Sequence, residues 1–225
     1  MTWVKICATT SLHDAQMSVA AGANALGFIF APSTRRIEVE QAAEIIAALP
    51  GEVEKIGVFV NEAPERVADI ASRAGLTGAQ LHGEEPPEQM AEFRGALGQR
   101  RIIKTLQARE LLGSVEMLEP YLCLGSAMDA ILLDSGSPAQ RGGTGVPFPW
   151  EEAVPIAAEI QAAMPVIIAG GLTPGNVCEA IRLFSPWGVD VVSGVEQAIG
   201  KKDEAKLQSF VAAVRTANRN EPLAK

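Results

Sequence analysis

Two side chains that can transfer protons close short apolar runs of the sequence. Cys7 ends the run 3–7, and Asp134 ends the run 130–134. A thiolate can remove a proton, although an isolated cysteine has a pKa of about 8.5 and needs nearby positive charge or N–H donors to ionise. A carboxyl group at the mouth of an apolar strand loses hydration, which favours its protonated form. The two groups could therefore act as the base and the acid of one reaction. A buried structural cysteine and a carboxylate that caps loop amides are the alternative interpretations.

Two pairs of small residues near the C-terminal end could bind a phosphate group. Gly170 and Gly171 follow one apolar run, and Ser193 and Gly194 follow the next. Small residues let backbone N–H groups approach an anion closely, which explains how an acidic chain could hold one. Glycines also make tight turns without any ligand. Two pairs at corresponding positions favour phosphate binding.

Four further side chains could contact a ligand. One of Arg35 and Arg36 could hold a carboxylate through two parallel hydrogen bonds while the other is solvated. His82 could orient a ligand, although a lone histidine is more often structural. Asp190 lies inside an apolar run, so its carboxylate needs a partner, either a sugar hydroxyl or a backbone amide. We therefore predict Arg35, His82 and Asp190 as substrate-binding residues.

A glycine-rich segment follows Asp134. Residues 135–145 include Gly142 and Gly143 and carry no apolar periodicity. Long connections of this kind often serve as lids or binding loops. We predict that Gly142 and Gly143 contact the substrate.

Eight short apolar runs, each followed by a helical pattern, must position these residues. The runs are 3–7, 25–30, 55–60, 79–82, 102–106, 130–134, 166–169 and 189–192. They recur roughly every 20–30 residues, as expected for βα units around a parallel sheet. An open doubly wound sheet would place a glycine turn directly after the first strand, where Cys7 and Ala8 stand. Eight units predict a single (β/α)8 barrel over residues 1–225, with its active site at the C-terminal strand ends.

Composition supports this fold and excludes several function classes. Hydrophobic residues make up 48% of the chain and aromatic residues only 5%, a mixture that suits strands buried on both faces. The net charge of −8 comes without a basic stripe, so we expect no nucleic-acid partner. Three scattered cysteines predict neither a disulfide framework nor a metal site, and favour a cytoplasmic protein. No run of residues is apolar and long enough to predict a membrane span.

The ordered set of motifs resembles the phosphoribosylanthranilate isomerase family of tryptophan biosynthesis. The matching segments are 4–7 (VKIC), 27–30 (GFIF), 33–35 (STR), 57–61 (GVFVN), 80–83 (QLHG), 133–134 (LD), 142–145 (GGTG), 169–172 (AGGL) and 188–196 (GVDVVSGVE). They span almost the whole chain in order. Ala8 is a departure, because the family usually has glycine after the first cysteine.

The resemblance implies a (β/α)8 barrel and an Amadori rearrangement. The reaction converts N-(5-phosphoribosyl)anthranilate to 1-(2-carboxyphenylamino)-1-deoxyribulose 5-phosphate, the third step from chorismate to tryptophan. By resemblance, Asp134 protonates the furanose ring oxygen, and Cys7 removes the C2 proton. Arg35 holds the anthranilate carboxylate, Asp190 positions the sugar, and the two small-residue pairs hold the phosphate. No metal or organic cofactor is implied, because the substrate's own nitrogen supplies the electron sink.

Other interpretations remain open at the level of sequence. Another phosphate-binding barrel enzyme could use Lys104, which lies inside the fifth run, whereas only two histidines in the chain argue against a metal-dependent epimerase. A non-catalytic barrel that binds phosphorylated ligands would not need Cys7 and Asp134, but both are present. We expect the partner to be a small phosphorylated aminosugar and the protein to be a monomer or a homodimer.

Overall fold

Eight parallel strands close into a barrel in the computed structural model, which describes residues 1–135 and 149–220. The strands are β1 (Trp3–Ile6), β2 (Ala25–Ile29), β3 (Glu54–Phe59), β4 (Gly78–Leu81), β5 (Arg101–Gln107), β6 (Ala130–Asp134), β7 (Val166–Ile168) and β8 (Gly188–Val191). They pair in chain order, and β1 closes the barrel by pairing with β8. This architecture confirms the predicted (β/α)8 barrel.

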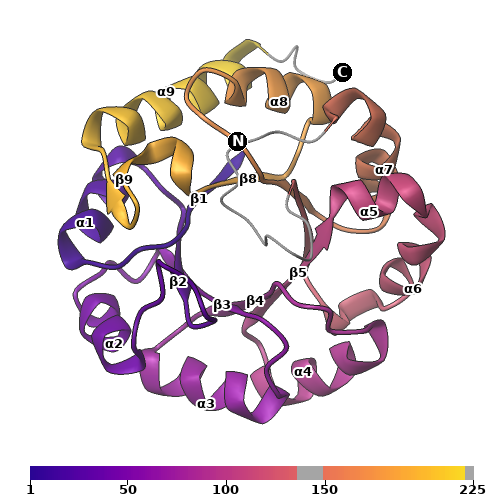
Figure 1. Cartoon of the computed structure of the whole chain (residues 1–225), viewed down its shortest axis with the longest axis horizontal. Coiled ribbons are helices and arrows are strands. Elements are labelled where there is room, and N and C mark those ends of the chain that lie inside the picture. Colours follow the sequence, from indigo (N-terminus) through magenta and orange to yellow (C-terminus); the bar gives the residue numbers. More distant parts are fainter. Residues whose placement is uncertain (136–148, 221–225) are drawn as a thin grey trace.

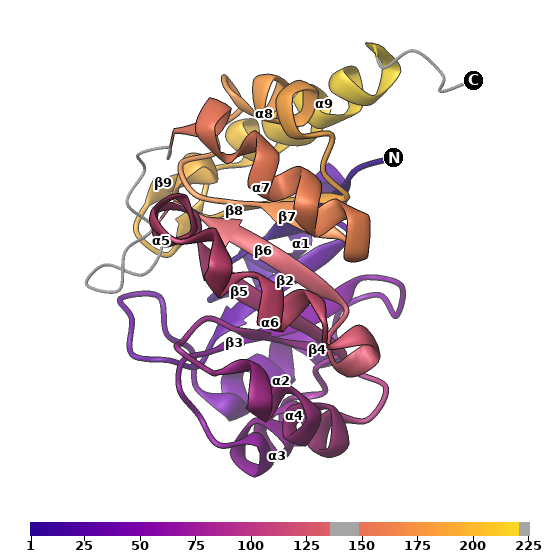
Figure 2. The same cartoon turned by 90° about the vertical axis from the view of Figure 1, so that its right-hand side faces the viewer.

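Helices form a ring around the barrel, as the view down its axis shows (Figure 1). They are α1 (Leu12–Ala21), α2 (Val39–Ala47), α3 (Pro64–Ala74), α4 (Met90–Leu97), α5 (Ala108–Gly113), α6 (Glu119–Leu122), α7 (Trp150–Ala163), α8 (Val177–Phe184) and α9 (Glu204–Asn220). The side view places α5, α6 and α7 in front of the strands (Figure 2). None of the helices in the described part of the chain is long and apolar enough to cross a membrane.

Local signals explain where several helices begin and end. The Ser11 side chain accepts a hydrogen bond from the Asp14 N–H and so caps the start of α1. After Ala21, the left-handed Gly22 caps its end. Pro64 occupies the first turn of α3, where its missing N–H has no partner to lose. Two features were not expected from the sequence: α6, and a hairpin of β9 (Glu196–Ala198) and β10 (Lys201–Lys202) after β8.

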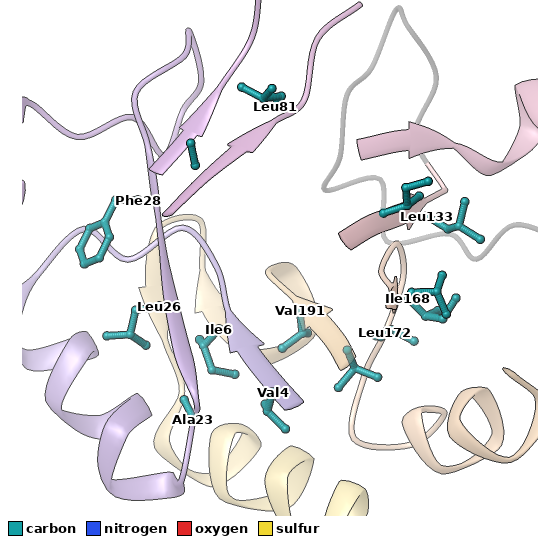
Figure 3. Close-up of a cluster of buried hydrophobic side chains, with 14 of the residues drawn as sticks. Val4, Ile6, Ala23, Leu26, Phe28, Leu81, Leu133, Ile168, Leu172 and Val191 are labelled. Carbon is teal, nitrogen blue, oxygen red and sulfur yellow. The ribbon is translucent and has the colours of Figure 1, made fainter. Parts of the chain in front are cut away.

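The alternation of side chains along each strand builds two separate cores. One cluster lies between the strands and the helices and includes Val4 and Ile6 of β1; Figure 3 shows both residues in this cluster. The second cluster fills the barrel interior and includes Trp3, Leu132 and Ile167. Because successive side chains of a strand point to opposite faces, every second residue of each strand faces inward. In β1 these are Trp3, then Lys5, and then Cys7 just beyond the strand.

Candidate active site

A cavity of about 510 Å³ opens at the C-terminal ends of the strands. Eight of the predicted site residues line it: Cys7, Arg35, His82, Asp134, Gly170, Gly171, Asp190 and Ser193. Their gathering in one cavity agrees with the rule that barrel enzymes build active sites at this end. Gly142 and Gly143 lie outside the described residues. The remaining predicted residue, Gly194, is not among the residues that line the cavity.

Cys7 lies at the end of β1 and faces the barrel interior. Gly27 of β2 stands opposite, and a side chain there would collide with the Cys7 sulfur, so this glycine makes room for the thiol. Ala8 has a φ of 63°, the left-handed region that glycine adopts most readily. This conformation explains why glycine suits the position after Cys7. The Lys202 ammonium fixes the same turn by donating to the Cys7 carbonyl oxygen at 2.6 Å.

Opposing effects act on the charge of Cys7. Burial raises the pKa of the Cys7 thiol, and the negative charge of Asp190 acts in the same direction. The ammonium groups of Lys5 and Lys202 lower it, but burial prevails. The sequence argument required positive charge near the thiol, and the structure supplies it from two lysines.

The Lys5 ammonium lies fully buried inside the barrel. It donates to Asp190 Oδ1 at 3.0 Å and to Gln80 Oε1 at 2.8 Å, and it lies near enough to the Cys7 side chain for each group to affect the pKa of the other. Burial lowers the pKa of Lys5, but Asp190 and Cys7 together raise it above its ordinary value, so the group stays charged. Asp190 therefore has a protein partner that the sequence analysis did not name, the Lys5 ammonium.

Neither Lys5 nor Gln80 was predicted as a site residue, although a signal was present. Each is a polar residue inside an apolar strand, two positions before a predicted site residue, Cys7 or His82. A spacing of two along a strand places side chains on the same face. The inward direction of Cys7 and His82 therefore implies the inward direction of Lys5 and Gln80.

His82 and Asp134 approach each other across the cavity mouth from β4 and β6. The Nε2 atom of His82 lies 3.3 Å from Oδ2 of Asp134. The other ring nitrogen, Nδ1, lies 3.0 Å from the amide nitrogen of Gln80, which also contacts Thr105 Oγ1 at 3.0 Å. A continuous set of polar contacts thus runs from Lys5 through Gln80 and His82 to Asp134.

The structure distinguishes the two neighbouring arginines. Arg35 lines the cavity, and its Nε and Nη2 groups donate to the buried carboxylate of Glu196 at 2.7–3.2 Å. Arg36 instead has a half-exposed side chain that pairs with Glu38 at 3.3 Å. Arg35 is therefore the arginine that can meet a ligand, and Glu196 holds one edge of its guanidinium group. Glu196 was missed because it lies on the unexpected β9.

The turns after β7 and β8 present backbone N–H groups to the cavity. Gly170 and Gly171 both have positive φ, 77° and 69°, which turns the chain sharply after β7. Within the described residues no acceptor is recorded for the N–H groups of Gly171 and Ser193. Gly194 does not line the cavity. A side chain at Gly194 would collide with the Leu172 carbonyl, so this glycine lets the two turns pack together.

The structure also bears on two alternative chemistries. In residues 1–135 and 149–220, no three His, Cys, Asp or Glu side chains are close enough together to hold a metal ion. Lys104, the candidate for a lysine mechanism, does not line the 510 Å³ cavity. Its ammonium donates to Glu85 Oε2 at 2.6 Å and to the Gly83 carbonyl at 2.8 Å. Lys104 is thus on the opposite face of β5 from Thr105, which contacts Gln80 inside the barrel.

Comparison with known proteins identifies the family. The profile of N-(5'-phosphoribosyl)anthranilate (PRA) isomerase matches residues 4–213. The chain is 46% identical over 212 residues to the N-(5'-phosphoribosyl)anthranilate isomerase of Geobacter sulfurreducens, covering 94% of this chain and 97% of that one.

Solved structures agree with this match. The phosphoribosyl anthranilate isomerase of Thermotoga maritima is similar with a TM-score of 0.82 and 37% identity, over 96% of this chain and 100% of that one. A phosphoribosyl anthranilate isomerase in complex with reduced 1-(o-carboxyphenylamino)-1-deoxyribulose 5-phosphate has a TM-score of 0.80 and 36% identity, with the same coverage of 96% and 100%. The chain therefore belongs to the N-(5'-phosphoribosyl)anthranilate isomerase family.

Proposed function

We propose that this chain converts N-(5'-phosphoribosyl)anthranilate to 1-(2-carboxyphenylamino)-1-deoxyribulose 5-phosphate, with Asp134 as the acid and Cys7 as the base. The observation that carries the proposal is that one cavity holds both groups together with Arg35 and the two N–H-bearing turns. Proton delivery and proton removal need separate groups, and these come from different strands, β6 and β1. Membership of the isomerase family supports the same reaction.

The first step opens the sugar ring. Asp134 gives its proton to the furanose ring oxygen as the bond from that oxygen to C1 breaks. The lone pair of the anthranilate nitrogen forms a double bond to C1, which gives an iminium ion. Asp134 becomes a carboxylate, and His82, 3.3 Å away, is the neighbouring group that can support it.

The second step removes a proton from C2. The Cys7 thiolate takes the proton, and the electrons of the C–H bond form the C1–C2 double bond and neutralise the iminium nitrogen. The resulting enolamine tautomerises to the ketone. The Lys5 ammonium is positively charged and lies near the Cys7 side chain. Its charge stabilises the thiolate before this transfer. One proton is delivered and one is removed, so the isomerisation is balanced.

The two ends of the substrate fit different parts of the cavity. The N–H groups of Gly171 and Ser193 are neutral donors that can hold the phosphate without added positive charge. Arg35 can hold the anthranilate carboxylate, because its Nε and Nη2 groups face Glu196 while Nη1 has no recorded acceptor among the described residues. Asp190, which accepts from Lys5, also lines the cavity and can accept from a sugar hydroxyl.

The catalytic roles predict the effect of two conservative substitutions. Cys7→Ser and Asp134→Asn should each lower kcat by at least about 100-fold, because each removes one partner of an acid–base pair. Both variants should keep the circular dichroism spectrum and the thermal midpoint of the wild type within a few degrees. Turnover of phosphoribosylanthranilate by either variant at close to the wild-type rate would exclude the role assigned to that residue.

The neighbouring arginines provide a matched pair of variants for the carboxylate. Arg35→Lys should raise KM about tenfold or more with little change in kcat, because lysine cannot reproduce the guanidinium fork. Arg36→Lys should leave both constants unchanged, since Arg36 is half-exposed and pairs with Glu38. Steady-state kinetics decide the point: equal effects of the two substitutions would contradict the assignment of Arg35.

The burial of Cys7 predicts a pH dependence. Because burial raises the pKa of the Cys7 thiol, the thiolate should form only above the pH at which ordinary cysteines ionise. The ultraviolet absorbance of the thiolate measures this in a Cys123→Ser, Cys178→Ser variant, with Cys7→Ser added as the blank. The value of kcat/KM should rise over the same pH range, since it follows ionisation of the free enzyme. A thiolate already formed at neutral pH in the ligand-free protein would contradict this prediction.

A further inference from the structure

The orientation of the Gln80 amide is fixed by the lysine beside it. The Lys5 ammonium has three N–H donors and no acceptor, and its recorded partners are Asp190, Gln80 and the Cys7 side chain. Only the oxygen of an amide can accept a hydrogen bond, so the Gln80 oxygen must face Lys5. The amide NH2 group must then point the other way, to Thr105 and His82.

This orientation determines which nitrogen of His82 carries a proton. The Gln80 nitrogen lies 3.0 Å from His82 Nδ1, and an amide nitrogen can only donate. His82 Nδ1 must therefore accept, so it has no proton, and the proton of the neutral ring lies on Nε2. A charged imidazolium ring would place an N–H group against the N–H of Gln80. The contact with Gln80 therefore favours the tautomer that carries its proton on Nε2.

The Nε2–H group of His82 points to the proposed acid. His82 Nε2 is buried and has no well-aligned hydrogen bond within the described residues, and Asp134 Oδ2 lies 3.3 Å from it. A positive imidazolium ring beside Asp134 would stabilise its carboxylate form and so disfavour the protonated acid. A neutral ring has no such effect before the reaction. When Asp134 has given up its proton, the waiting Nε2–H can donate to the new carboxylate.

We infer that Gln80 is a positioning residue: held by Lys5, its amide fixes His82 as the neutral tautomer protonated at Nε2, and this N–H group supports Asp134 through the proton transfer. The inference rests on the proposed function for the role of Asp134 as the acid. The fixed tautomer itself rests only on the contacts of Lys5, Gln80 and His82. The same ammonium contacts the Cys7 thiol, so one buried lysine orders the groups around both the base and the acid.

The protonation of His82 can be observed directly in the ligand-free protein. The chain has two histidines, and the other, His13, is exposed, so a His13→Gln variant leaves a single ring for nitrogen-15 NMR. We expect a spectrum at neutral pH with an unprotonated Nδ1 and a protonated Nε2. A proton on Nδ1, or on both nitrogens, would overturn the inference.

Two substitutions of Gln80 separate positioning from mere packing. In Gln80→Glu, a carboxylate accepts from both Lys5 and His82, so the ring proton should move to Nδ1. The value of kcat should fall about 10- to 100-fold, part of what an acid contributes, with KM nearly unchanged. In Gln80→Met, which fills similar space without a donor, neither tautomer should be fixed. Gln16→Glu, the same charge change at an exposed position of α1, is the control and should change neither the ring nor kcat.

The outcomes distinguish this inference from the proposed function. A fall in kcat in Gln80→Glu with the His82 proton still on Nε2 would show a structural role only and would overturn the inference. A shifted proton with unchanged kcat would overturn it as well. Failure of the wild-type protein to convert phosphoribosylanthranilate would contradict the proposed function, while the ring spectrum would still decide the tautomer. Should Gln80→Glu not fold, Gln80→Met and the wild-type spectrum decide the question.

Discussion

A charged lysine inside a barrel is stable only if hydrogen-bond acceptors surround it. The buried Lys5 therefore requires acceptor side chains from several strands of the site. Removal of an ammonium group from water costs several kcal/mol unless its donors are satisfied. Asp190 comes from β8, Gln80 from β4, and the Cys7 thiol from the end of β1. These strands must therefore close in the observed register, in which Lys5 lies beside Asp190. The closure of the barrel and the charge of the site depend on the same contacts.

The barrel interior changes in character from one end to the other. In β1 the inward residues are Trp3 in the apolar inner cluster, then Lys5 among polar partners, and then Cys7 at the cavity. Along β4 the same order holds: the inward Gln80 belongs to the polar layer, and His82, two residues later, lines the cavity. An apolar layer thus supports a hydrogen-bonded layer, which in turn orients the groups that contact the ligand. Because buried hydrogen bonds fix side-chain geometry, the middle layer gives the reacting groups defined directions.

The residues at strand ends were predictable from the sequence, because an apolar run shows where a strand stops. The run 130–134 is the observed β6, and Cys7 follows directly after β1. The eight strands and most helix starts were found in the same way, whereas α6 and the hairpin of β9 and β10 lack comparable apolar patterns. The family resemblance then supplied the expected reaction.

The partners of the site residues could not be predicted, since they depend on contacts between distant parts of the chain. The pairing of Lys5 with Asp190 joins residues 185 positions apart, and that of Arg35 with Glu196 joins residues 161 apart. No local pattern encodes such pairs. The choice between Arg35 and Arg36 likewise needs the direction of each side chain. Glycine suits both an anion site and the close packing of two turns, so its residue type alone does not separate these roles; at Gly194 the structure shows the close packing against Leu172, and the phosphate contact stays a prediction.

The most direct test of this account is a crystal structure of the protein with reduced 1-(o-carboxyphenylamino)-1-deoxyribulose 5-phosphate, the ligand held by a solved relative. We predict that the phosphate accepts from the N–H groups of Gly171 and Ser193 and that the carboxylate meets Arg35. The sugar carbons should then lie between the Cys7 sulfur and the Asp134 carboxyl group. A ligand bound in the reverse direction, or with its C1 and C2 atoms out of reach of Cys7 and Asp134, would contradict the mechanism.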